Sequence, residues 1–171
     1  MNDANRELRW SRRLSVVPRW PVVPTINKQS VDQHVFHVTR IVMWLLPYHA
    51  QAVDDDPAFK FDVVRMALGH DDPEASTGDI PTPRKGPANY SAMPQKAIIV
   101  KVADILEAIM FLVEEREMGN KRVGAILLER RAALEAAWSH FKQVPGADIS
   151  ATAIMNAAVG AVMESHPAME K

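Results

Sequence analysis

The sequence predicts an all-α fold, a single-domain bundle of five to seven helices that spans residues 1–171. Three observations favour this fold. Apolar residues recur at three- and four-residue spacing in several segments, residues typical of helix starts and stops bound these segments, and the sequence offers no convincing pair of strands. The length of 171 residues also suits one domain with a core of its own.

The N-terminal part is expected to hold two helices joined by a stiff connector. Residues 3–14 have the pattern of a short amphipathic helix. Residues 16–28 contain three prolines, which exclude a regular helix and predict an extended segment. Ser30 is a candidate N-cap because Gln33 follows three residues later, as in a capping box. The helix that begins there is expected to end near Pro47.

The later helices follow from the same signals. A second core helix is expected to end at His70 and Asp71. Residues 72–88 are rich in Pro, Gly and Thr, which predicts one short helical turn followed by a loop. Three more helices are expected over residues 91–118, 121–142 and 148–165, separated by the stop signals Gly119-Asn120 and Pro145-Gly146.

Composition excludes several classes of function. The chain has no cysteine, so disulfides and thiolate metal sites are excluded and any metal must be held by nitrogen and oxygen. A net charge of −1 gives no overall field to attract nucleic acid. The polar N-terminus is no signal peptide, and the longest apolar stretch, residues 41–47, is too short to span a bilayer. We therefore expect a cytoplasmic protein with neither membrane nor nucleic acid as partner.

One group of residues has the character of a metal site. His70 and Asp71 follow an apolar helix, His34 lies on the preceding core helix, and Asp104 lies inside a strongly apolar helix. A carboxylate in such a helix is unfavourable unless it is paired or bound to a cation. Together these side chains would suit Mn, Fe, Co, Ni or Zn and leave positions open for water and phosphate.

The residues alone leave the alternatives open. A His-Asp dipeptide is common by chance, and a helical aspartate is usually solvated or paired with a basic side chain. His37, on the same helix as His34, could equally be a structural residue. The three remaining histidines outside this group are interpreted as surface residues: His49, His140 and His166.

The order His…His-Asp…Asp resembles the HD-domain phosphohydrolases. The resemblance is carried by RWP at 19–21, SVDQH at 30–34, HDDPEASTGDIPTPRK at 70–85 and VKVADILEA at 100–108. These segments look like the bacterial 5′-deoxynucleotidases and, equally, the compact phage dATP triphosphohydrolases of that superfamily. The resemblance covers about residues 10–120. It implies a helical HD-domain bundle of bacterial or bacteriophage origin.

The resemblance also implies roles for individual residues. It implies metal ligands at His34, His70, Asp71 and Asp104, catalytic carboxylates at Glu74 and Asp79, and substrate contacts at Arg19, Trp20, Lys85 and Lys101. The cofactor would be a divalent transition metal (Co, Mn, Zn, Ni or Fe), with Mg²⁺ as a further ion on the phosphates. On chemical grounds Glu74 or Asp79 could exchange a proton with water or the leaving oxygen, while Arg19 offers a planar fork for phosphate.

The proline-flanked pair Arg19-Trp20 suggests how a deoxynucleotide could be selected. Pro18 and Pro21 would present both side chains with little entropy to lose. Trp20 could stack on a base or occupy the space of a ribose 2′-hydroxyl, or it could simply close the edge of the core. Val22 and Ile26 are weaker candidates for the lining of a base pocket.

Three functions are compatible with these motifs. Asp104 follows the Thr82-Pro83 segment closely, which is more similar to the phage enzymes. We therefore expect a dNTP (dATP) triphosphohydrolase that releases deoxynucleoside and triphosphate. A 5′-deoxynucleotidase acting on dNMPs is the alternative, and a non-catalytic nucleotide sensor is an alternative of another class. Relatives assemble as dimers or hexamers, so a homo-oligomer is expected.

Overall fold

The structure, a computed structural model, describes residues 12–50, 56–79, 89–145, 147, 149–154 and 156. These residues contain no strand, only two isolated β-bridges that pair Pro18 with Ser30 and His49 with Gln143. Their α-helices are α2 (Val31–Leu45), α4 (Pro57–Gly69), α5 (Glu74–Thr77), α7 (Gln95–Glu117) and α8 (Gly124–Trp138). Short 3-10 helices are η1 (Arg12–Val16), η2 (Leu46–Tyr48), η3 (Tyr90–Ala92) and η4 (Lys121–Val123). The prediction of an all-α fold is confirmed.

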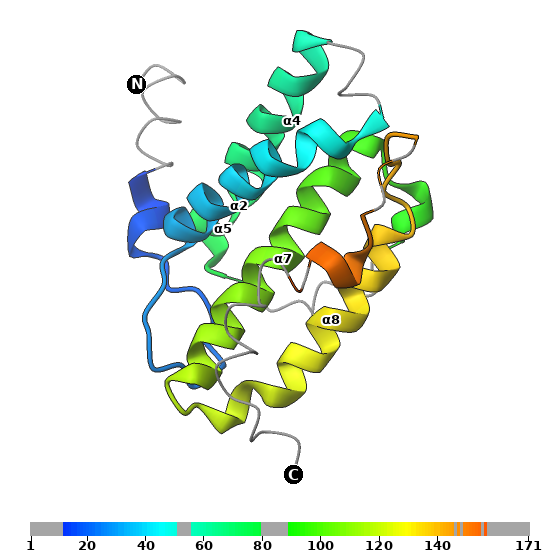
Figure 1. Cartoon of the computed structure of the whole chain (residues 1–171). Helices are drawn as coiled ribbons and strands as arrows, with labels where there is room; N and C mark the ends of the chain where they lie inside the picture. Colours follow the sequence, from blue (N-terminus) through cyan, green and yellow to red (C-terminus); the bar gives the residue numbers. More distant parts are fainter. Residues whose placement is uncertain are drawn as a thin grey trace, which may run out of the picture.

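The helix α7 forms the centre of the bundle (Figure 1). It packs against α2, α4 and α8, and most of its side chains are buried. Ile98, Ile105 and Leu112 are at most 1% exposed. A helix that is apolar on nearly all sides is stable only when neighbours cover all its faces. No helix of the described residues is long and apolar enough to cross a membrane.

The helix boundaries agree with the predicted ones where local signals are strong. The Ser30 N–H donates to Gln33 Oε1 at 3.0 Å, half of the expected capping box at the start of α2. The long helix α7 begins only after Pro94, later than predicted, and residues 90–92 form η3 instead. A proline at this position favours a helix start because it lacks the N–H that a helix interior needs.

Three predicted elements differ or lie partly outside the described residues. The helix expected over 121–142 is divided into η4 and α8 and ends at Trp138. Of the helix expected over 3–14, only residues 12–14 are described, and these belong to η1. Of the helix expected over 148–165, the described residues 151–154 and 156 are helical.

The connector before α2 is extended and is tied to the end of α7. Glu115 is fully buried, and its carboxylate accepts hydrogen bonds from the backbone N–H groups of Ile26 and Asn27, both at 2.7 Å. The Asn120 side chain donates to the same carboxylate at 2.7 Å and to the Pro24 carbonyl at 2.8 Å. These bonds hold a proline-rich segment that could not hold itself by helical hydrogen bonds.

His49 corrects a prediction, because the structure buries it completely. Its ring stacks on Phe59, with 5.7 Å between the centroids, and meets the edge of Phe141 at 5.0 Å. Its Nε2 lies 3.1 Å from Gln95 Oε1. Burial lowers the pKa of His49, so the neutral ring is favoured. The interpretation as a surface residue is wrong because the aromatic partners come from distant parts of the chain.

Candidate metal centre

Two histidines and two aspartates converge where α2, α4 and α7 meet. His34 lies in the first turn of α2, His70 caps the C-terminus of α4, Asp71 follows it, and Asp104 lies on α7. His34 Nε2 is 3.3 Å from Asp104 Oδ1 and 3.6 Å from Asp71 Oδ2. His70 Nε2 is 3.4 Å from the same Asp71 oxygen. The structure therefore brings together all four residues that were expected to bind metal.

The donor atoms of this cluster fit a divalent cation. Ligand atoms of His34, His70 and Asp104 all lie within 4.8 Å of one another. His34 Nε2, His70 Nε2 and Asp71 Oδ2 are buried and make no hydrogen bond among the described residues. Buried polar atoms without a partner are unfavourable, and three of them pointing to one place are explained by a shared cation. Imidazole and carboxylate donors suit Zn, Mn, Fe, Co or Ni.

A hydrogen bond orients the second histidine. His70 Nδ1 lies 2.7 Å from the Ala67 carbonyl oxygen one turn earlier in α4, and this oxygen can only accept. Nδ1 therefore carries the proton, and the lone pair of Nε2 faces the cluster. The end of the helix supplies this carbonyl because the last carbonyls of a helix lack partners of their own.

Arg19 is the main cation beside the cluster. Its guanidinium lies 3.2 Å from Asp79 Oδ1, 3.5 Å from Asp104 Oδ1 and 3.6 Å from Asp71 Oδ2. Burial lowers the pKa of Arg19, but these three carboxylates outweigh burial and raise it. A planar guanidinium held in this way can also present donors to a phosphate.

Trp20 is fixed between the connector and α7. Its backbone N–H donates to Asp79 Oδ2 at 2.8 Å, and its ring stacks on Phe111, with 5.8 Å between the centroids and 9° between the planes. Its φ of 62° lies in the left-handed region, which is unfavourable for a bulky side chain and marks a conformation imposed by its surroundings. Trp20 thus packs against the edge of the core, and its contact with substrate stays a prediction. Its Nε1 is buried with no hydrogen bond among the described residues.

The two expected catalytic carboxylates occupy different environments. Glu74 begins α5 and is 3% exposed. Asp79 follows Gly78, whose φ of 73° is one that glycine adopts readily, and it binds Arg19 and the Trp20 backbone. Asp79 therefore orients the connector, whatever further part it plays in the chemistry.

The charged side chains of the cluster shift one another's pKa values. Burial raises the pKa of Asp104, but Lys101, His34 and Arg19 lower it well below its usual range. Burial and Arg19 lower the pKa of His34, but the carboxylates of Asp104 and Glu107 raise it to about 9. Lys101 Nζ lies 2.6 Å from Asp104 Oδ2, which places this lysine at the cluster as its position three residues before Asp104 predicts.

Other expected contacts are placed differently. Val22 is 65% exposed and Ile26 is 54% exposed, so the structure does not bring either side chain into a closed base pocket. Lys85 lies outside the described residues. Two further residues were not predicted from the sequence: Glu107 is hydrogen-bonded to His34, and Gln29 is hydrogen-bonded to Glu107. Glu107 could have been found by the argument used for Asp104, since it is a second carboxylate inside the same apolar helix.

The fold and the site define a helical protein with a buried histidine–aspartate metal centre. The family model of the HD domain matches residues 11–144, and the chain belongs to this family. The predicted HD-domain membership is therefore confirmed.

Named relatives and a solved structure agree with this assignment. A dATP triphosphohydrolase of Salmonella phage PMBT28 is 34% identical over 123 residues, covering 60% of this chain and 63% of that protein. A 5′-deoxynucleotidase of Cronobacter sakazakii is 32% identical over 91 residues, covering 50% of this chain and 43% of that protein. The chain thus spans less than two thirds of the length of either relative.

The solved structure shows a similar fold. It is the cyanophage S-2L HD phosphohydrolase bound to dA and one catalytic Zn²⁺ ion. It has a TM-score of 0.58 and 19% identity to this chain, and the match covers 92% of this chain and 94% of the other.

Proposed function

We propose that this protein is a metal-dependent phosphohydrolase that acts on deoxynucleotides. The observation that carries the proposal is the convergence of His34, His70, Asp71 and Asp104 beside the buried guanidinium of Arg19. Relatives named as dATP triphosphohydrolase and 5′-deoxynucleotidase support it. Cations next to a phosphate stabilise the negative charge that develops during phosphoryl transfer.

In this proposal the four clustered residues hold one divalent transition metal. Their nitrogen and oxygen donors suit Zn, Co, Mn, Ni or Fe, and any Mg²⁺ would accompany the phosphates. When bound, such a metal lowers the pKa of a water and offsets charge on the phosphate. Asp71 and Asp104 also offset the charge of the metal, so that burial of the complete site becomes favourable.

In the proposal, the surrounding side chains bind the phosphate, position one another and transfer a proton. Arg19 donates to the phosphate oxygens, and Asp79 keeps Arg19 and Trp20 in place. Glu74 is a buried carboxylate at the start of α5 and can transfer a proton. Lys101 offsets the charge of Asp104 and can shift toward a phosphate, because its side chain is 27% exposed. Lys85 stays a predicted phosphate contact.

A deoxynucleoside triphosphate, with dATP favoured, is the proposed substrate. Two phage relatives named dATP triphosphohydrolase support it, and the second is 30% identical over 142 residues. The bacterial relatives named 5′-deoxynucleotidase favour deoxynucleoside 5′-monophosphates as the second candidate. The homo-oligomer and the single domain over residues 1–171 stay predictions.

A substrate screen with product identification tests the proposal. The purified chain, supplied with Mn²⁺, Co²⁺ or Zn²⁺, is offered dNTPs, dNMPs and NTPs, and a chelator-treated sample is the control. Inorganic triphosphate from dATP is the expected product. Orthophosphate from dNMPs alone would support the second candidate. Metal binding without turnover of any nucleotide would contradict both and favour the nucleotide sensor.

A further inference from the structure

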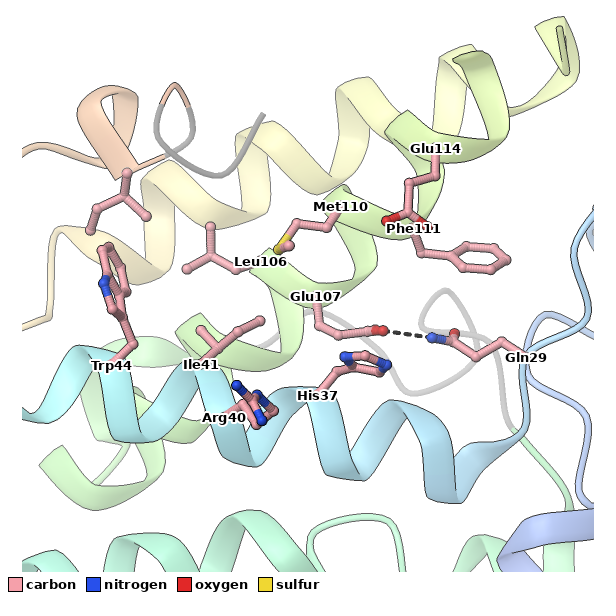
Figure 2. A pocket seen from close by; sticks show the side chains of 11 residues that line it. Gln29, His37, Arg40, Ile41, Trp44, Leu106, Glu107, Met110, Phe111 and Glu114 are labelled. Atoms are coloured by element: carbon pink, nitrogen blue, oxygen red, sulfur yellow. Dashed lines mark hydrogen bonds between the residues drawn. The ribbon is translucent and has the colours of Figure 1, made fainter. Parts of the chain in front are cut away.

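A buried chain of hydrogen bonds lies behind His34, on the side away from the proposed metal position. Glu107 is 4% exposed, and its Oε2 is hydrogen-bonded to His34 Nδ1. Its other oxygen, Oε1, accepts from Gln29 Nε2 at 2.6 Å. Figure 2 shows this second bond, which joins Glu107 on α7 to Gln29, two residues before the start of α2. Both carboxylate oxygens are therefore engaged, one by each partner.

The geometry assigns the tautomer of His34. A carboxylate can only accept, so Nδ1 must carry the proton that the contact with Glu107 shares. Nε2 faces Asp71 and Asp104, the side on which the metal is proposed, and would bind a metal there by giving up its own proton. Carboxylates that accept from a ligating histidine fix its ring and raise its basicity.

Gln29 extends the chain of bonds to the substrate side. Its backbone carbonyl accepts a hydrogen bond from the backbone N–H of Arg19 at 2.8 Å, while its side chain donates to Glu107. One residue thus contacts both the connector that carries Arg19 and the carboxylate that orients His34. Gln29 and Glu107 also line a cavity of about 520 Å³ between α2 and α7. Among the described residues, Gln29 is the hydrogen-bond partner of Glu107 Oε1.

We propose that Glu107 is the positioning residue for His34 in the metal centre, and that Gln29 couples this carboxylate to the Arg19 connector. This inference rests on the metal centre of the proposed function but not on its substrate. The test therefore measures metal affinity, which needs no nucleotide.

The test compares Zn²⁺ affinity, measured by competition with a chromophoric chelator, in wild type and in Glu107→Gln. Loss of such an outer partner typically weakens metal binding about 10–100-fold, and we expect a loss in this range. Glu114→Gln is the matched control, since Glu114 lies two turns further along α7, lines the same cavity and is exposed. Its Zn²⁺ affinity should stay within about twofold of wild type, as expected for an exposed group.

Gln29→Ala tests the coupling. It should weaken Zn²⁺ binding less than Glu107→Gln, and the double variant should lose no more than Glu107→Gln alone, because the two side chains act through one path. Losses that multiply would overturn the coupling. The exchange Gln29→Glu with Glu107→Gln restores the bond between the two positions and should recover part of the affinity.

A spectroscopic measurement covers the case in which Glu107→Gln does not fold. In the Zn²⁺-loaded wild type labelled with ¹⁵N-histidine, His34 should show a protonated Nδ1 and a zinc-bound Nε2. Coordination through Nδ1, or an unchanged Zn²⁺ affinity in a folded Glu107→Gln, would overturn the inference. A wild type that turns over no nucleotide but binds Zn²⁺ would contradict the proposed substrate alone. A wild type that binds no Zn²⁺ would contradict the metal centre itself and overturn the inference with it.

Discussion

Two histidines, one in the first turn of α2 and one just beyond its far end, are equally buried but differ in their neighbours and in the direction of their pKa shifts. His34, in the first turn of α2, faces Asp71, Asp104 and Glu107, and its pKa is raised to about 9. His49, just beyond η2, lies against Phe59 and Phe141, and burial lowers its pKa. Both have an exposed fraction of 0%. Burial therefore does not distinguish His34, the proposed metal ligand, from His49, which packs in the core; the charge of their neighbours does.

The largest effect is expected at the His34 end. Asp104→Ala removes an oxygen that lies 3.3 Å from His34 Nε2 and leaves Arg19 and Lys101 beside the gap. Metal affinity should fall by more than about 100-fold, beyond the usual effect of an outer partner. Metal content after dialysis checks this. Asp62→Ala is the control, because Asp62 pairs with Lys96 at the surface. Unchanged metal content in Asp104→Ala would remove Asp104 from the site.

The His49 end should respond in stability and not in metal binding. His49→Ala removes a ring stacked on two aromatic side chains, and such large-to-small changes cost about 2–5 kcal/mol. Urea unfolding should show this loss, while Zn²⁺ affinity of the folded variant stays at the wild-type value. His49→Phe keeps the ring contacts and should lose less. A large drop in Zn²⁺ affinity in His49→Phe would break the contrast between the two ends.

Glu115 provides a third buried ionisable group, and hydrogen bonds are the main interactions that stabilise its charge. Glu115→Gln replaces an acceptor by a donor that would face the N–H groups of Ile26 or Asn27. The expected loss of stability is about 1–3 kcal/mol, the usual effect of leaving a buried group unsatisfied. Urea unfolding measures it, and Glu117→Gln on the same helix is an exposed control. Equal stability of the two variants would show that the connector does not depend on Glu115.

The smallest effect is a pH dependence of stability with two separate windows. The pKa of His49 lies below its usual value of 6.5, so below about pH 6.5 the unfolded chain binds a proton that the folded protein resists. Stability should decline there, and His49→Phe should remove this decline.

Burial raises the pKa of Glu115, but hydrogen bonds from Asn120, Ile26 and Asn27 lower it below its usual 4.5. Its stabilisation is present above pH 4.5 and is lost as the pH falls further. Urea unfolding from about pH 8 down to about pH 3 covers both windows, and identical profiles for wild type and His49→Phe would contradict the assignment of the upper window to His49.

The sequence predicted the helices well where short-range signals fix them. Ser30 and Gln33 define the start of α2, and Gly119 with Asn120 marks the end of α7 within two residues. The start of α7 was predicted too early because apolar spacing continues before Pro94, and only the proline determines where regular helix can begin.

The site was predictable only in part, because its geometry is non-local. His34, His70, Asp71 and Asp104 were found through the family resemblance, since spacing alone left the metal site open. The structure adds Glu107 and Gln29, whose contacts join positions far apart in the chain. His49 was misjudged for the same reason: the segment that follows it, residues 50–56, has the composition of a polar loop, while its aromatic neighbours lie elsewhere.

The helix α7 also limits where the chain can accept an inserted or deleted residue. Asp104, Glu107, Phe111 and Glu115 follow one another at intervals of three or four residues, so they share one face. One inserted or deleted residue between Asp104 and Glu115 would rotate the following part by about 100°. The Trp20 stack and the connector anchor would then lose register with the metal centre in one step. Insertions and deletions within α7 should therefore not be tolerated, because they would separate the metal centre from the anchor of the connector.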